Sequence, residues 1–184
     1  AALLDHLKHS GQAYTDMLGR KQTGPDPTKP VFLYCGFEFP HTPVLPPSEF
    51  REKCAGAHYE IPKFTKEELE GMPQQIANAL KSHGSDHFTD AEKQQMLSDY
   101  FAYCAYGDTL VGKLTDGFIS HSEAQGRPWL ILLVCGDNGW KLNHHGMISK
   151  FLHYDHDLHN PIIAISSDKK AFPAGKVVKD LTAF

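Results

Sequence analysis

Asp137 and Asn138 are the residues whose types and spacing offer the most chemistry in this chain. They follow the apolar run Trp129–Val134 and have Gly136 and Gly139 on either side. A carboxylate and an amide oxygen are hard donors of the kind that calcium and magnesium bind, and the glycines allow the backbone to bend around a ligand. The pair therefore predicts part of a metal site, although an ordinary Asp-Asn-Gly turn after a core strand has the same residues.

Basic side chains follow this pair within one short segment. His144, His145 and Lys150 can carry positive charge and donate hydrogen bonds to an anion. A metal ion and an anion could therefore share this part of the chain. The chain has twelve histidines, and most are expected to be solvated or hydrogen-bonded surface groups, so a single histidine is weak evidence.

His41 lies in a second candidate segment, directly after the apolar run Val31–Gly36. Several prolines surround it, including Pro40 and Pro43. Proline fixes its own φ and restricts the residue before it, so this loop is stiff and can hold a side chain still. A loop histidine without a chemical role remains the alternative.

The elements that must position these residues alternate between strand and helix. Val31–Gly36, Trp129–Cys135 and the shorter run Ile162–Ile165 predict strands buried on both faces. Apolar residues at steps of three and four predict a long helix near Asp90–Ser120. Together they predict a three-layer α/β/α domain with a mainly parallel sheet. Ligand-binding groups collect at the carboxyl ends of parallel strands, so His41 and the Asp137 segment are expected to converge in one pocket.

Local signals mark helix starts and close packing. Thr65 with Glu68, and Thr89 with Glu92, match the capping box that begins a helix. Gly107 and Gly112 cost helix propensity inside the long helix and predict close packing of this helix against the sheet.

Composition limits the classes of partner. The net charge of −4 gives no support to a nucleic-acid-binding surface, and no apolar run is long enough to span a membrane. The four cysteines (Cys35, Cys54, Cys104 and Cys135) form no CxxC pair, so neither disulfides nor the redox compartment can be inferred. Cys35 and Cys135 lie in strand-like contexts and are expected to be buried thiols.

Four segments in order resemble the sulfatases of the alkaline-phosphatase superfamily, most closely the iduronate-sulfatase and choline-sulfatase type. They are VFLYCGFEFPHTPVLPPSEF, YFAYCAYGDTLVGKLTDGF, CGDNGWKLNHHGMISKF and YDHDLHNPIIAIS, and they span residues 31–166. The resemblance implies that residues 1–184 form the middle and later part of a sulfatase-like catalytic domain whose amino-terminal part is missing. It also favours a periplasmic or secreted location.

The resemblance implies a role for each candidate residue. Asp137 and Asn138 would hold a divalent cation, usually calcium, and Lys150 would contact the sulfate oxygens. His41 would contact the ester or protonate the leaving alcohol, and His145 would stand near the sulfate. These roles are chemically sensible, because charge moves onto the leaving oxygen as a sulfate ester is cleaved. The implied substrate is a small-molecule or carbohydrate sulfate ester.

Two parts of the family pattern are absent from these residues. The family's nucleophile is a formylglycine made from a cysteine in a Cys-x-Pro/Ala-x-Arg motif, and none of the four cysteines lies in such a motif. The strand that usually ends in paired aspartates is absent too. The isolated chain is therefore expected to be inactive. A phosphate or phosphonate monoester hydrolase, or a binding domain without catalysis, remains the alternative to sulfate ester hydrolysis.

Overall fold

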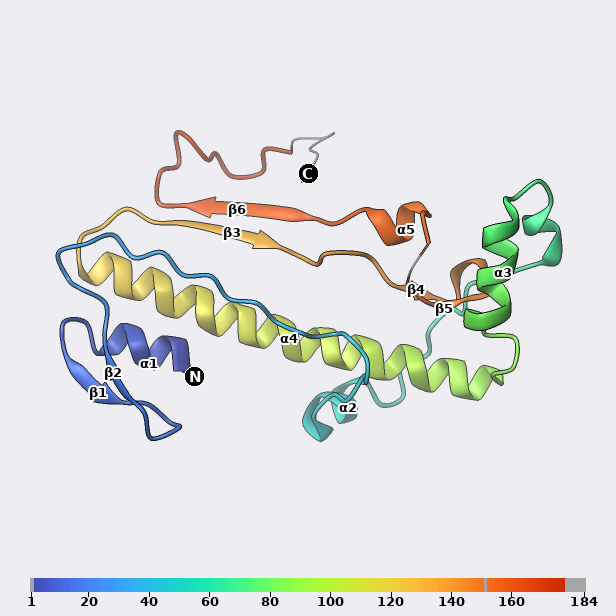
Figure 1. Cartoon of the computed structure of the whole chain (residues 1–184), viewed down its shortest axis with the longest axis horizontal. Helices are drawn as coiled ribbons and strands as arrows, with labels where there is room; N and C mark the ends of the chain where they lie inside the picture. Colours follow the sequence, from blue (N-terminus) through green and yellow to red (C-terminus); the bar gives the residue numbers. More distant parts are fainter. Residues whose placement is uncertain (1, 151, 178–184) are drawn as a thin grey trace. The chain divides into compact units, whose positions relative to one another are not determined.

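The computed structural model describes residues 2–150 and 152–177, which divide into two compact units. Unit 1 contains residues 2–37, 108–133 and 163–177, and unit 2 contains residues 38–107 and 134–162. The helices are α1 (Ala2–Lys8), α2 (Ser48–Cys54), η1 (Lys66–Leu69), α3 (Gln74–His83), α4 (Asp90–Ala124), η2 (His144–Gly146) and α5 (Asp155–Leu158) (Figure 1). The strands are β1 (Ala13–Thr15), β2 (Lys21–Thr23), β3 (Leu130–Val134), β4 (Lys141–Leu142), β5 (Ile148–Ser149) and β6 (Ile162–Ser166).

The predicted helix and two of the three predicted strands are confirmed. α4 covers the predicted Asp90–Ser120, β3 lies within Trp129–Cys135, and β6 covers Ile162–Ile165. Val31–Gly36 forms no strand, so that prediction was wrong.

The prediction of a mainly parallel sheet was also wrong for the described residues. β1 pairs with β2, and β4 with β5, in antiparallel hairpins. β3 pairs with β6, and the arrows of these two strands point in opposite directions in Figure 1. Hydrogen bonds at the two ends of this pair, from Ser167 N to Trp129 O and from Cys135 N to Pro161 O, fit the same antiparallel direction.

Among its described residues, the connection between β3 and β6 contains no helix long enough to carry the chain back along β3. A parallel return needs a crossover that carries the chain back along the strand. The connection contains the β4–β5 hairpin and α5, a helix of four residues. At about 1.5 Å per residue such a helix spans roughly 6 Å, which is far less than the roughly 17 Å of a five-residue strand.

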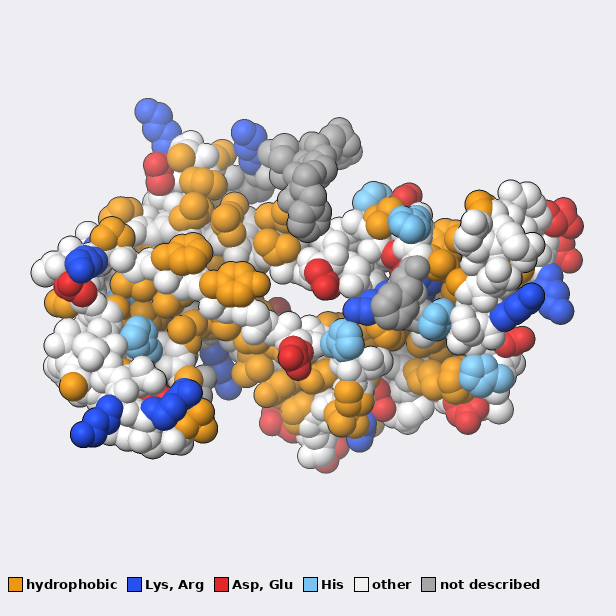
Figure 2. All heavy atoms as spheres, in the orientation of Figure 1, with side chains coloured by type: hydrophobic (Ala, Val, Ile, Leu, Met, Phe, Trp, Pro, Cys, Tyr) orange, Lys and Arg blue, Asp and Glu red, His pale blue; other side chains and the backbone are white. Residues whose placement is uncertain are grey.

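Burial on both faces of β3 was predicted and is not found. Exposure alternates along the strand, and Leu132 and Val134 keep 60% and 62% of their surface exposed. Phe32 and Tyr34, in the segment predicted as a strand, are exposed by 89% and 86%. Figure 2 shows hydrophobic side chains gathered on the visible face of unit 1 around β3. The apolar runs are present as predicted, but among the described residues nothing covers one of their faces.

Two of the cysteine predictions fail for the same reason. Cys35 and Cys135 are exposed, not buried, because they lie in or beside these uncovered apolar runs. Cys54 and Cys104 are half-buried.

Both predicted capping boxes are confirmed. Thr89 and Glu92 bond reciprocally at the start of α4, and Thr65 with Glu68 forms the capping box of η1.

Close packing of α4 on the sheet at Gly107 and Gly112 was predicted and is not found among the described residues. Gly107 lies against the loop residue Phe39, whose ring carbon would be 2.1 Å from an added Cβ, and an added Cβ at Gly112 would meet nothing within 4 Å. A side chain at position 107 would displace the Phe39 ring.

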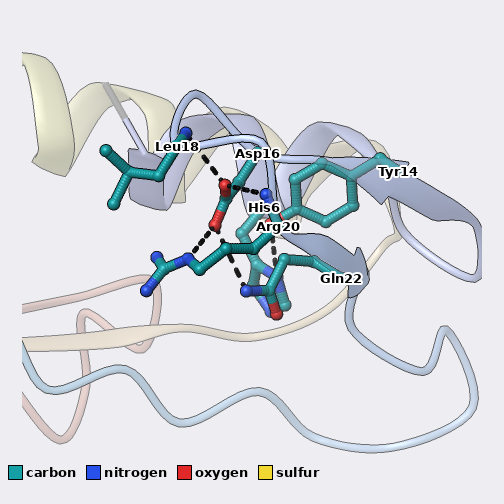
Figure 3. Close-up of polar contacts among 6 residues, drawn as sticks. All are labelled: His6, Tyr14, Asp16, Leu18, Arg20 and Gln22. Atoms are coloured by element: carbon teal, nitrogen blue, oxygen red, sulfur yellow. Dashed lines mark hydrogen bonds and ion pairs between the residues drawn. The ribbon is translucent and has the colours of Figure 1, made fainter.

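In unit 1, a carboxylate organises the β1–β2 hairpin (Figure 3). Asp16 accepts hydrogen bonds from the backbone N–H groups of Leu18 and Arg20, each at 2.9 Å, and from the side chains of Arg20 and Gln22. These bonds, the backbone bond from Arg20 above all, lower the pKa of Asp16 to about 2. The turn is thus held by an ionised side chain.

The hairpin should lose stability in acid. Because the pKa of Asp16 is lower in the folded than in the unfolded chain, its stabilisation is present above about pH 4 and is lost as the pH falls towards 2. We expect Asp16→Asn to flatten the fall in the free energy of unfolding across this window. Urea titrations at several pH values measure this, and an unchanged slope would contradict the role given to Asp16.

Candidate functional site

The loop after β3 has the sharp bends that the glycines predicted. Gly136 has φ +126°, a conformation that side chains rarely adopt. Gly139 lies so close to α5 that an added Cβ would overlap the carbonyl oxygen of His156. Its N–H donates to the carbonyl of Asp157 at 2.9 Å. The close approach of α5 to the Asp137 loop therefore requires glycine at position 139.

Two of the predicted site residues are in contact. Lys150 Nζ donates to Asn138 Oδ1 at 3.4 Å, and the Asn138 amide donates to the Gly139 carbonyl at 2.8 Å. Asn138 and Lys150 are half-buried, whereas the Asp137 carboxylate beside them is exposed. Asn138, which is predicted to bind the metal ion, is thus in contact with Lys150, which is predicted to bind the anion, within unit 2.

His145 lies in the same unit and is held by its surroundings. Its backbone has φ +54°, in the left-handed region that few non-glycine residues occupy. Its ring stacks on Tyr154 with centroids 4.1 Å apart and planes 8° apart, and Nδ1 lies 3.2 Å from Glu68 Oε2. The Glu68 carboxylate therefore faces the histidine that is predicted to stand near an anion.

His41 lies in an exposed loop of the same unit. Its Nδ1 lies 2.8 Å from the carbonyl oxygen of Thr42, and its N–H donates to Glu38 O. Within the described residues these hydrogen bonds stay in its own loop. The convergence of His41 with the Asp137 loop therefore remains a prediction.

The sequence did not predict the buried ion pair between Lys141 and Asp157, which adjoins the Asp137 loop. Lys141 Nζ lies 2.7 Å and 2.6 Å from the two carboxylate oxygens of Asp157, and the two side chains are 0% and 3% exposed. Lys141 stands between the apolar residues Trp140 and Leu142, and Asp157 lies sixteen positions later in a polar segment. No local pattern predicts that they pair, because the contact depends on how the intervening residues fold.

A cluster of histidine rings adjoins the pair. The ring of His156 lies 4.4 Å from that of His144 and 5.9 Å from that of His145, measured between centroids. Burial lowers the pKa of His144, and the neighbouring His156, His145 and Lys141 lower it further. His144 is therefore neutral at pH 7, and its buried Nδ1 has no hydrogen-bond partner among the described residues.

A network of side-chain hydrogen bonds fixes the backbone around the histidines. Asn143, itself at φ +77°, donates from its amide to the Pro62 carbonyl at 2.6 Å and accepts from the Ser85 hydroxyl. Ser85 also donates its N–H to the Gly146 carbonyl at 2.8 Å. Segments before α4 are thereby fastened to η2.

A cavity of about 470 Å³ opens beside His144 in unit 2. Apolar and aromatic side chains form most of its wall, and Tyr59 and Phe101 stack with centroids 4.9 Å apart. The lining residues are Tyr59, Glu60, Pro62, Leu97, Phe101, Leu142 and His144.

The metal prediction is supported by the chemistry of the donors but not by their number. Asp137 and Asn138 offer hard oxygen atoms, as calcium requires. Within residues 2–150 and 152–177, no group of three or more His, Cys, Asp and Glu side chains is arranged to hold a metal ion. Calcium takes six to eight oxygen ligands, so these two residues supply only part of a coordination shell.

Comparison with known proteins decides the family. The sulfatase family model matches residues 7–182. This chain belongs to the sulfatase family. Membership implies an α/β fold of the alkaline-phosphatase type. The chain is also 25% identical to human (Homo sapiens) iduronate 2-sulfatase over 173 residues, which cover 85% of this chain and 30% of the relative. The chain thus spans less than a third of that relative. No solved structure matches significantly.

The comparisons confirm the resemblance to iduronate-type sulfatases. They do not test the individual site residues, which remain predictions. As for the membrane, none of the described helices is both long and apolar enough to cross one.

Removing one partner of the buried pair should be costly. Lys141→Met leaves the Asp157 carboxylate buried without its counter-charge, and we expect a loss of about 3–5 kcal/mol in the free energy of unfolding. The matched control is Lys53→Met, which removes the exposed i,i+4 pair with Glu49 and should cost less than about 1 kcal/mol. Urea unfolding followed by circular dichroism compares the two. Equal losses would show that the Lys141–Asp157 pair is not buried as described.

His144 should titrate below its ordinary pKa of 6.5. As the pH falls, the unfolded chain binds a proton at His144 before the folded chain does. The free energy of unfolding should therefore decrease as the pH falls through 6.5. Histidine ring signals followed by NMR give the midpoint, and His144→Gln should remove this part of the pH dependence. A midpoint for His144 at or above 6.5 would contradict the assigned environment.

Proposed function

We propose that this chain forms part of a domain that hydrolyses sulfate monoesters. The observation that carries the proposal is the contact of Lys150 with Asn138, which brings a cation and an oxygen ligand together in a loop of a sulfatase-family chain. The name of the human relative, iduronate 2-sulfatase, supports a carbohydrate sulfate ester as the substrate class.

The proposed roles follow from the charge that moves during ester cleavage. Lys150 and His145 bind the sulfate oxygens, and His41 delivers a proton to the leaving alcohol. Asp137 and Asn138 contribute two oxygen ligands to calcium, which supplies a Lewis acid at the sulfate when it is bound. The apolar cavity beside His144 is suited to the organic part of the ester, because aromatic faces pack against the flat surfaces of rings.

The formylglycine nucleophile of the family has no counterpart in these 184 residues. None of the four cysteines has the Cys-x-Pro/Ala-x-Arg context from which formylglycine is made. Without a covalent step that divides the barrier, anion binding without turnover is the behaviour that we propose for the chain as given.

Sulfate binding tests the proposal directly. Lys150→Ala removes a charge-assisted hydrogen bond worth about 1.5–3 kcal/mol, so we expect about tenfold or more weaker binding of inorganic sulfate by isothermal titration calorimetry. Lys113→Ala on the exposed surface of α4 is the matched control and should leave the affinity unchanged.

Three results would contradict or redirect the proposal. Equal affinities of the Lys150→Ala and Lys113→Ala variants for sulfate would show that Lys150 does not contact the anion. Tighter binding of phosphate than of sulfate would favour the phosphate-ester alternative. Turnover of an aryl sulfate by the 184-residue chain, lost in Lys150→Ala, would show that a nucleophile is present within it.

A further inference from the structure

The short helix α5 is fastened to the Asp137 loop at two neighbouring points. The Asp157 carbonyl accepts the N–H of Gly139 at 2.9 Å. The Asp157 carboxylate holds Lys141 through both of its oxygens, in a position that excludes solvent from both side chains. Asp157 therefore fixes both the backbone of Gly139, which is next to Asn138, and the side chain of Lys141.

The same helix also supports His145. Tyr154 directly precedes α5, and its carbonyl accepts the N–H groups of Asp157 and Leu158 at 2.8 Å and 3.2 Å. The Tyr154 ring lies flat against His145, and Lys141 Nζ lies 5.7 Å from the centroid of that ring. A histidine with φ +54° needs neighbours that hold it in place, and the Tyr154 ring is one of them.

A buried ion pair fixes geometry better than it adds stability. An apolar pair of similar volume often stabilises a protein equally well, because two charges must lose their hydration on burial. An apolar pair can slide, however, whereas a lysine bonded to both oxygens of a carboxylate has one arrangement. The pair is thus suited to hold a loop in register.

We propose that Lys141 and Asp157 are positioning residues for the anion site, acting through Gly139 on Asn138 and through Tyr154 on His145. This rests on the proposed function for the roles of Asn138 and His145. Residues that orient binding side chains without touching the bound ion commonly change its affinity by about 10-fold to 100-fold when they are lost.

The test replaces the charged pair with an apolar pair of similar size, Lys141→Met with Asp157→Leu. We expect this double variant to unfold cooperatively, with shifted His145 ring signals in the NMR spectrum and about 10-fold to 100-fold weaker binding of inorganic sulfate. Lys53→Met with Glu49→Gln removes an exposed pair and is the matched control, with wild-type signals and affinity.

A second variant keeps the test decisive if the double variant does not fold. Asp157→Glu preserves both charges but lengthens the acid by one methylene, so it should fold and still weaken sulfate binding and move the His145 signals. Wild-type His145 signals with wild-type sulfate affinity, in either folded variant, overturn the positioning role. Absence of sulfate binding by the wild-type chain overturns the proposed function instead, and the His145 signals then decide the positioning role alone.

Discussion

The buried ion pair between Lys141 and Asp157 is the interaction on which the candidate site depends. An ammonium group with no exposed surface is tolerated only with a counter-charge in good geometry, and the two oxygens of Asp157 provide it. The pair ties β4 to α5, and those elements carry or adjoin the residues proposed to bind calcium and sulfate. On the other side of the histidines, Asn143 bonds to Pro62 and Ser85. Asn143 and His145, whose backbones both have positive φ, thus lie between these two sets of contacts.

The sequence predicted well the features that depend on local chemistry. The start of α4 follows from the Thr89–Glu92 capping box, and its length from the apolar period. The bend at Gly136 follows from glycine's freedom to adopt positive φ. In each case the decisive interaction lies within a few turns of the chain.

The features that failed depend on partners distant in sequence. An apolar run such as Trp129–Val134 indicates a strand but not its direction or the number of faces that are covered. Exposure alternates along β3, so the side chains of Leu130, Leu132 and Val134 stay exposed and contribute little of the about 1.5–3 kcal/mol that full burial of such a side chain gives. Val31–Gly36 is a similar apolar run, yet it forms no strand. The Lys141–Asp157 pair escaped prediction because a lysine among apolar residues looks like a surface group until its partner is known.

The central claim is that Lys150 and His145, held by the surrounding contacts, form an anion site in a sulfatase-family chain. A crystal structure of the chain grown with sulfate, and again with selenate to locate the anion by its anomalous signal, tests it most directly. The account predicts one anion within hydrogen-bond distance of Lys150 Nζ and next to the His145 ring, with Lys141 and Asp157 still paired beneath it. An anion bound elsewhere, with no density beside Lys150, would contradict it.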